Sequence, residues 1–244
     1  VLFRSGMTGT YNAKERNGNG ITMGGYSTQI VVDQRYTLHI SDKLNLAAVA
    51  PLLCAGITTY SPLVFAGVKK GMKVAVLGLG GLGHMGVKFA VSFGAEVTVI
   101  STSPSKEADA KKLGATHFIV STNTETMKKY NSYFDVILDT ISANHDFTTY
   151  LNLLTTNGKL LVVGLPIEAP KVQPFSLVTN RRSVIGSSIG GMKETQEMLD
   201  YCAEHNIVSD IEIIPMQAIN EAYTRMLKGD VKYRFVIDLA SLKS

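Results

Sequence analysis

The sequence predicts an α/β protein built on a doubly wound parallel sheet, joined to the remnant of a smaller and mostly antiparallel β domain. Three observations support this fold class. After Gly71, short runs of Val, Ile and Leu alternate with helical patterns, as expected of strands buried on both faces. A glycine-rich segment follows the first of these runs. Before Gly71, two segments alternate apolar and polar residues, which is typical of half-buried strands.

The composition is that of a globular protein. The 244 residues are 45% hydrophobic and 18% charged, which argues against disorder. The net charge of +4 is spread along the chain, so we expect no nucleic-acid partner. No apolar run approaches the length that crosses a bilayer, so we expect no membrane partner either. Cys54 and Cys202 form no disulfide framework, which favours a cytoplasmic location.

The amino-terminal region is predicted to belong to a β domain of which only part is present. Residues 1–6 (VLFRSG) lead into no clear element and resemble a non-native leader, and residues 7–24 are polar and glycine-rich, as loops are. We therefore expect a truncated chain. Residues 26–32 and 36–40 alternate apolar and polar side chains and are predicted strands. Pro51 is expected near the start of the next helix.

The remaining elements follow in order from the hydrophobic pattern. Each predicted strand is a short apolar run, and each predicted helix has apolar residues at helical spacing. Up to residue 186 the strands lie at 74–77, 97–100, 118–120, 136–138, 160–163 and 184–186, with helices at 82–93, 104–113 and 147–154. The tail is predicted to form a helix at 193–205, a strand at 211–214, a helix at 217–227 and a strand at 235–239.

We place the domain boundaries where these patterns change. Residues 1–53 are assigned to the remnant of the β domain, including the leader at 1–6. Residues 54–190 contain the alternating strands and helices of the doubly wound sheet. Residues 191–244 are expected to return to the first domain.

The glycine-rich segment has the spacing of a phosphate-binding turn. Gly78 permits a tight turn after the first strand, Gly80 lets the backbone approach a pyrophosphate, and Gly83 lets the helix pack on the sheet. The free N–H groups at the start of that helix attract an anion. The motif is weak by itself, but here a strand precedes it and a helix and a second strand follow. The sequence therefore predicts a dinucleotide-binding Rossmann sheet, with the cofactor held at Gly78, Leu79, Gly80, Gly81, Leu82 and Gly83.

The segment after the second strand favours NADP over NAD. An NAD site carries an Asp or Glu there, which bonds the ribose 2′-hydroxyl. This sequence instead has Ser101, Thr102 and Ser103, followed by Lys106. Hydroxyl donors and a lysine suit a 2′-phosphate, which a carboxylate would repel. Ser103 and Pro104 also satisfy the start of a helix unaided, and both roles are compatible.

Several segments together resemble the medium-chain zinc alcohol dehydrogenases. They are residues 51–63 (PLLCAGITTYSPL), 78–86 (GLGGLGHMG), 101–106 (STSPSK), 186–195 (GSSIGGMKET) and 233–238 (YRFVID). Within that superfamily the sequence is similar to the cinnamyl-alcohol-dehydrogenase branch, which includes bacterial aldehyde reductases. The resemblance covers nearly everything from Gly24 to the end. It implies that the β remnant belongs to a GroES-like catalytic domain.

The resemblance also implies roles for residues outside the glycine turn. Cys54 would be a ligand of the catalytic zinc, although read without the family it would be a buried small hydrophobe. The other implied residues would contact the cofactor along its length: Thr58, Thr140, Gly164, Ser187, Ser188, Ile189 and Arg234. Cys202 is expected to be a core thiol. For His84 two interpretations stay open, a place near the cofactor and a packing or surface role.

Other parts that the family carries are missing from this sequence. The family binds zinc through a Cys, a His-Glu pair and the later Cys, and carries a four-cysteine structural zinc lobe. Because one thiolate cannot hold zinc tightly, we expect this chain to bind little zinc and to be inactive alone. The intact parent would be an NADP-dependent alcohol dehydrogenase that transfers hydride between NADPH and an aldehyde or primary alcohol.

Two alternatives to this function remain. A zinc-independent NADPH quinone or enoyl reductase of the same superfamily would share the glycine turn without needing Cys54. A non-catalytic NADP-binding protein would need only the cofactor site. The resemblance further implies a homodimer joined through the edge strand at Ser183–Ile189.

Overall fold

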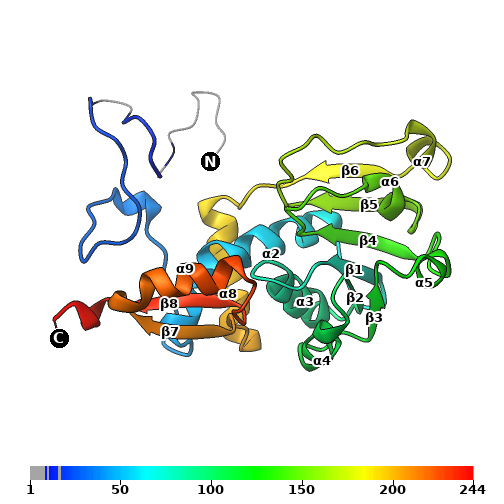
Figure 1. Ribbon diagram of the computed structural model, residues 1–244. Coiled ribbons are helices and arrows are strands. Elements are labelled where there is room, and N and C mark those ends of the chain that lie inside the picture. Colours follow the sequence, from blue (N-terminus) through cyan, green and yellow to red (C-terminus); the bar gives the residue numbers. More distant parts are fainter. Residues whose placement is uncertain (1–8, 10, 16–17, 244) are drawn as a thin grey trace.

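The computed structural model describes residues 9, 11–15 and 18–243 (Figure 1). The predicted leader at 1–6 lies outside the described residues. At the centre is a six-stranded sheet in the order β3-β2-β1-β4-β5-β6, with every neighbouring pair parallel. This is the order of a doubly wound dinucleotide-binding sheet, in which the chain builds outward from β1 on one side and then on the other. The predicted doubly wound parallel sheet is confirmed.

The strands of the sheet form from the apolar runs that predicted them. Val76 of the first strand pairs with Val99 on one side and Leu138 on the other, so the carboxyl ends of these strands meet at one edge. The fifth strand starts earlier than expected, at Leu154, and the preceding helix is correspondingly shorter. The six strands are β1 (Lys73–Leu77), β2 (Glu96–Ser101), β3 (His117–Val120), β4 (Phe134–Asp139), β5 (Leu154–Val162) and β6 (Ser183–Gly186).

Both faces of the sheet are covered, because successive side chains of a strand point to opposite faces. Val74 and Val76 lie in one hydrophobic core, and Ala75 and Leu77 lie in the other. This alternation explains why the strands are apolar throughout. The first core also contains residues of α2 (Ala55–Ala66), α3 (Gly83–Ser92), α4 (Glu107–Lys112) and α8 (Met192–His205), and the second contains residues of α5 (Thr124–Lys128) and α6 (Phe147–Leu151).

The chain after α8 forms a separate unit, which we define as residues 207–243 and call the C-terminal unit (Figure 1). Its strands β7 (Ile211–Pro215) and β8 (Arg234–Asp238) are parallel, and α9 (Ile219–Leu227) connects them. The positions of these elements were expected from the sequence, but their pairing is parallel, whereas a mostly antiparallel domain was predicted here. The shorter elements of the described chain are α1 (Leu46–Val49), α7 (Pro174–Val178) and the 3₁₀ turns η1 (Gln34–Tyr36), η2 (Ala50–Leu53), η3 (Pro104–Lys106), η4 (Met216–Ala218) and η5 (Leu239–Lys243).

The prediction of two strands near the amino end is wrong. Residues 26–32 form no strand, and neither do residues 36–40, of which Tyr36 is the last residue of η1. Ile30 is 76% exposed and Val31 is fully exposed, so the apolar side of this segment has nothing to pack against. A strand needs a hydrogen-bonded neighbour and a packed face. Among the described residues of this region only the isolated bridge between Lys14 and Ile21 forms.

Among the described residues, no single helix has the length and apolar character to cross a bilayer. The bent pair formed by Leu46–Leu53 and Ala55–Ala66 satisfies both criteria only when its two segments are counted together.

Candidate cofactor-binding site

The glycine turn connects β1 to α3, as its spacing predicted. Gly78 has a φ of 83°, a conformation that side chains disfavour. A Cβ on Gly83 would lie 2.1 Å from the carbonyl oxygen of Gly78, so only glycine lets the helix approach the turn this closely. The turn is therefore fixed by local backbone geometry.

Gly80 and Gly81 face the space in front of the turn. A Cβ on Gly80 would meet no atom within 4 Å, whereas one on Gly81 would lie 2.5 Å from the Cζ of Arg234. Arg234 comes from β8 of the C-terminal unit, 153 positions along the chain from Gly81. Its Nε is buried and has no hydrogen-bond partner among the described residues. A buried, unpaired guanidinium nitrogen beside a phosphate-binding turn fits a phosphate oxygen.

The end of β2 carries the residues predicted to select NADP. Lys106 donates a hydrogen bond from Nζ to the carbonyl oxygen of Leu79, 3.0 Å away, so the lysine lies against the glycine turn. Ser101 is buried, and its Oγ accepts a bond from the backbone N–H of Ser103 at 3.2 Å. Thr102 is exposed. Thus a cation and hydroxyls lie where an NAD site has its acid.

Thr140 and Gly164 lie at the same edge of the sheet. Thr140 follows β4, and its Oγ1 donates to the Leu77 carbonyl oxygen at 2.7 Å, directly before the glycine turn. Gly164 follows β5, and a Cβ there would lie 2.1 Å from the carbonyl oxygen of Ile141. These two segments therefore pack tightly against each other, and the predicted residues come together because parallel strands end at one edge.

The remaining predicted contacts form a loop after β6. Ser187 donates from its backbone to Val162 at 3.0 Å, while Ser188 and Ile189 are exposed, and Ile189 has a φ of 46°. A Cβ on the next residue, Gly190, would lie 2.7 Å from the side chain of Ile57. Thr58 adjoins Ile57 on α2 and is nearly buried. The structure thus brings this loop against the amino-terminal part of α2.

Sequence reasoning missed a buried pair beside Thr140. Asp139, at the end of β4, is fully buried, and its Oδ2 lies 2.8 Å from Nε2 of His145. Burial is the main cause that raises the pKa of Asp139. His145 Nδ1 also bonds the Ala143 carbonyl oxygen at 2.8 Å, so the pair holds the loop after β4 in one shape. The signal available in the sequence was an acid ending a buried strand, with a histidine six residues later.

His84 is a packed residue adjacent to the turn. It is completely buried in the first turn of α3. Its Nδ1 lies 3.2 Å from the Gly80 carbonyl oxygen, and its Nε2 lies 3.0 Å from Oγ of Ser209. Burial lowers the pKa of His84 to about 4. The packing role left open by the sequence is the one observed, at a position next to the candidate site.

The two cysteines differ in their surroundings. Cys202 is fully buried, and burial raises the pKa of its thiol to about 12, as suits the predicted core thiol. Cys54 is exposed at the start of α2, whereas burial was the expectation from residue type alone. Within the described part of the chain, no group of three or more His, Cys, Asp or Glu side chains is arranged to hold a metal. The described residues therefore do not fit a zinc site at Cys54.

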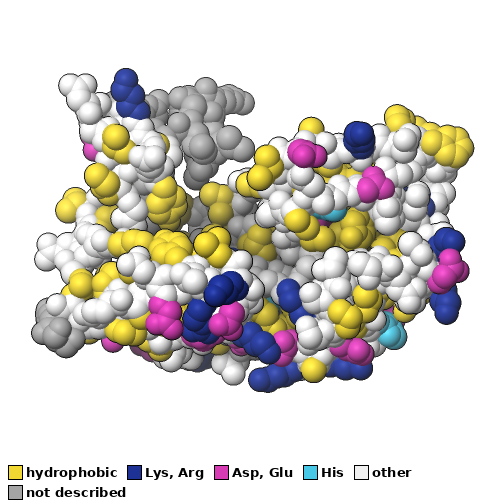
Figure 2. Space-filling view, in the orientation of Figure 1, with side chains coloured by type: hydrophobic (Ala, Val, Ile, Leu, Met, Phe, Trp, Pro, Cys, Tyr) yellow, Lys and Arg dark blue, Asp and Glu magenta, His cyan; other side chains and the backbone are white. Residues whose placement is uncertain are grey.

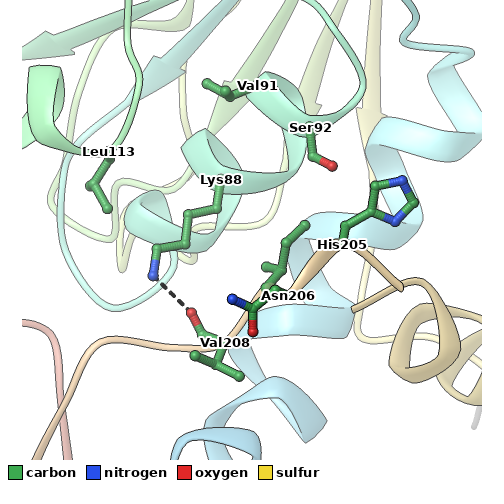
Figure 3. Close-up of a pocket in the computed structure, with 8 residues that line it drawn as sticks. Lys88, Val91, Ser92, Leu113, His205, Asn206 and Val208 are labelled. Atoms are coloured by element: carbon green, nitrogen blue, oxygen red, sulfur yellow. Dashed lines mark hydrogen bonds between the residues drawn. The ribbon is translucent and has the colours of Figure 1, made fainter. Parts of the chain in front are cut away.

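A surface cavity of about 370 Å³ lies away from the glycine turn (Figure 3). Its lining comes from α3 with Lys88, from Leu113 directly after α4, from the end of α8 with Asn206 directly after it, and from the first residues of the C-terminal unit. No residue predicted to bind the cofactor lines it. The cofactor site is therefore defined by the turn and the sheet edge.

Exposed apolar side chains gather on the described residues before α1, which we call the N-terminal segment, and on the adjoining C-terminal unit (Figure 2). Tyr26 of the first and Tyr223 of the second have their hydroxyls 2.9 Å apart. Met23 is 81% exposed and Leu227 is 87% exposed. This surface therefore carries several large apolar side chains that are exposed to solvent.

Known proteins are similar to this chain in both sequence and fold. A family model described as zinc-binding dehydrogenase matches residues 81–204. The NADP-dependent alcohol dehydrogenase C 1 of Mycolicibacterium smegmatis is 55% identical over 98% of this chain and 68% of its own length. The aldehyde reductase YahK of Escherichia coli is 52% identical over 97% of this chain and 68% of its own length.

Solved structures agree with these relatives. A cinnamyl alcohol dehydrogenase from Sorghum bicolor matches with a TM-score of 0.91 and 42% identity, over 94% of this chain and 66% of its own. A structure described as CAD from Helicobacter pylori complexed with NADP(H) matches with a TM-score of 0.87 and 45% identity, over 96% of this chain and 67% of its own. This chain thus spans about two thirds of the length of these relatives. It belongs to the zinc-binding dehydrogenase family.

Proposed function

We propose that the protein is an NADP-dependent alcohol dehydrogenase, or aldehyde reductase, and that the described residues supply its cofactor site. The observation that carries this proposal is the convergence of three features at one sheet edge. They are the glycine turn, the buried unpaired Nε of Arg234 and the Nζ of Lys106 against Leu79. The names of the relatives, which are NADP-dependent alcohol dehydrogenases and aldehyde reductases, support the reaction class.

Each part of the site has a distinct task. The backbone of Gly80 leaves room for the pyrophosphate to approach the N–H groups of α3. Arg234 supplies charge-assisted hydrogen bonds to the same phosphates, and Lys106 with the hydroxyls after β2 holds the 2′-phosphate. Thr140 and Gly164 bound the site at the ends of β4 and β5. When bound, NADPH supplies the hydride for an aldehyde, or NADP accepts it from a primary alcohol.

The proposal assigns no zinc site to the described residues. Cys54 is the one ligand that the family resemblance assigns within this sequence, and the described residues offer it no metal-binding neighbours. We propose that this chain alone binds NADP and does not reduce aldehydes. The lack of metal-binding neighbours around Cys54 among the described residues supports the non-catalytic interpretation for the chain as given.

Cofactor titration tests the proposal. We expect NADPH to bind the purified chain, with enhanced nicotinamide fluorescence, and NADH to bind at least about tenfold more weakly because it lacks the 2′-phosphate. Calorimetry with NADP gives an independent affinity. A preference for NADH, or binding of neither coenzyme, would overturn the assignment. Consumption of NADPH with an aldehyde by the chain alone would refute the proposed lack of catalysis.

We also propose the location, domain division and assembly of the protein. Two free cysteines fit a cytoplasmic protein. We place the domain boundaries at residues 53 and 190, and α8 beyond the second boundary still packs in the first core of the sheet. Since β6 is an edge strand of the sheet, two copies can pair through Ser183–Ile189 and form a homodimer.

A further inference from the structure

Arg234 is attached to the C-terminal unit rather than to the sheet that forms the turn. It is the first residue of β8, and β8 pairs only with β7 among the described strands. Its guanidinium nevertheless lies on Gly81, close enough that an added Cβ would clash. The position of this charge therefore depends on how the C-terminal unit is seated on α3.

His84 occupies the junction between the turn and the C-terminal unit. Its Nδ1 lies 3.2 Å from the Gly80 carbonyl oxygen, and because a carbonyl can only accept, Nδ1 carries the proton. Nε2 of the neutral ring then accepts a bond from the Ser209 hydroxyl at 3.0 Å. The ring also stacks on Tyr233, with centroids 4.7 Å apart and planes 16° apart.

These three contacts link one side chain to both parts of the phosphate site. Gly80 belongs to the turn, Ser209 lies two residues before β7 in the C-terminal unit, and Tyr233 is covalently joined to Arg234. The ring is completely buried, and burial lowers its pKa to about 4. At neutral pH it is therefore uncharged, which is the form that accepts a bond from Ser209 and avoids a second cation beside Arg234.

A second contact seats the same unit farther along α3. Lys88, four residues after His84, donates from Nζ to the Val208 carbonyl oxygen at 2.8 Å and to Oδ1 of Asp210 at 2.7 Å. Figure 3 shows this lysine bending from the helix toward Val208. Lys88 therefore bonds the C-terminal unit to α3 only. His84 bonds that unit and contacts the glycine turn as well.

We infer that His84 is a positioning residue, which holds the C-terminal unit on α3 so that Arg234 lies over the phosphate-binding turn. The inference rests on the proposed function, since it concerns how the cofactor site is assembled. His84 is completely buried, so we assign it no direct contact with a phosphate. It acts through the placement of Arg234, and the Ser209 hydroxyl is its partner.

A double-mutant cycle tests this inference on the purified chain. His84→Phe keeps a buried ring for stacking on Tyr233 and removes both hydrogen bonds. Neither partner is orphaned, because the Gly80 carbonyl still accepts from the backbone of residue 84 and the Ser209 hydroxyl can bond the Asp210 carbonyl. We expect His84→Phe to weaken NADPH binding by about tenfold in the parent chain and by less than about twofold in the Arg234→Gln background.

Two serine variants provide a matched comparison. Ser209→Ala removes the hydroxyl that bonds His84 and is expected to weaken NADPH binding in the same direction. Ser92→Ala removes a similar hydroxyl contact from the same helix, its 2.6 Å bond to the Tyr201 hydroxyl, and is expected to leave NADPH affinity unchanged. Thermal unfolding and circular dichroism of each variant report whether the fold is retained.

The outcomes separate this inference from the proposed function. If the parent chain binds no NADPH, the proposed function fails first. If the parent binds NADPH but His84→Phe and Ser209→Ala bind it equally well, the inference is wrong. An equal loss in the Arg234→Gln background would also overturn it, because His84 would then not act through Arg234. Should His84→Phe not fold, the contrast between Ser209→Ala and Ser92→Ala decides.

Discussion

Single residues decide which anion the site can hold. Lys106 lies against the glycine turn, and no carboxylate stands among residues 101–106. Arg234 brings a second cation to the turn, on Gly81. The two cations have different proposed tasks, the 2′-phosphate for Lys106 and the pyrophosphate for Arg234, so their removal should be distinguishable.

Replacing Lys106 should abolish the preference for NADPH. The Lys106→Gln variant loses a charge-assisted bond, which is worth roughly 10- to 100-fold in affinity. We expect NADPH binding to weaken by that factor while NADH binding changes little. Calorimetric titration with both coenzymes measures the two affinities. The control variant is Lys111→Gln. Lys111 is an exposed lysine of α4 that pairs with Glu107, and its replacement should leave both affinities unchanged.

Two glycine substitutions in the turn should have different consequences. An Ala at position 81 meets only the flexible end of Arg234, so Gly81→Ala should fold normally while the displaced guanidinium lowers NADPH affinity by about tenfold. An Ala at position 83 meets the Gly78 backbone at 2.1 Å and should destabilise the domain by at least about 2 kcal/mol. Thermal unfolding and NADPH titration distinguish the two; equal melting temperatures would contradict this account.

At the scale of elements, the structure depends on contacts between helix α3 and the C-terminal unit. His84 and Lys88, one turn apart on α3, both bond residues of that unit. A completely buried histidine makes such a contact sensitive to acid, because burial disfavours its charged form. The effect should be visible in stability as well as in cofactor binding.

Lowering the pH should destabilise the protein through His84. Its pKa falls from 6.5 to about 4 on burial, so between these values the unfolded chain binds the proton and the folded chain does not. The free energy of unfolding should therefore decrease as the pH falls through this window, by about 3 kcal/mol at pH 4. Urea unfolding at several pH values measures it. The free energy of unfolding should depend less on pH in His84→Phe than in the parent chain. An equal dependence would show that His84 does not cause the effect.

The whole molecule presents two surfaces of different character. One is the exposed edge of β6, where the backbone of Ser187 bonds β5 at 3.0 Å. The other is the apolar surface of the N-terminal segment and the C-terminal unit (Figure 2). The first is a regular strand edge, which can be paired by another strand, and the second is an irregular patch.

Blocking the β6 edge should prevent the proposed dimer. At the two-residue period of a strand, Ile185 shares the β5-facing orientation of Ser187, so the N–H of Val184 points to the open edge. Val184→Pro removes that donor without removing a β5 bond. Size-exclusion chromatography with light scattering should show a dimer for the parent chain and a monomer for the variant. A parent chain that is monomeric at high concentration would rule out the proposed pairing.

The sequence by itself determined the sheet, because its strands are buried on both faces and therefore read as continuous apolar runs, such as 74–77. It also determined the glycine turn, whose requirements at Gly78 and Gly83 are local backbone geometry. Only the tertiary structure placed Arg234 on Gly81 and buried His84 between the glycine turn and Ser209. No periodic pattern in the sequence predicts either contact, because each joins residues that are far apart along the chain. The failed strands at 26–32 and 36–40 have the same cause. Alternation predicts which face a strand would bury, but only a packed neighbour makes the strand form.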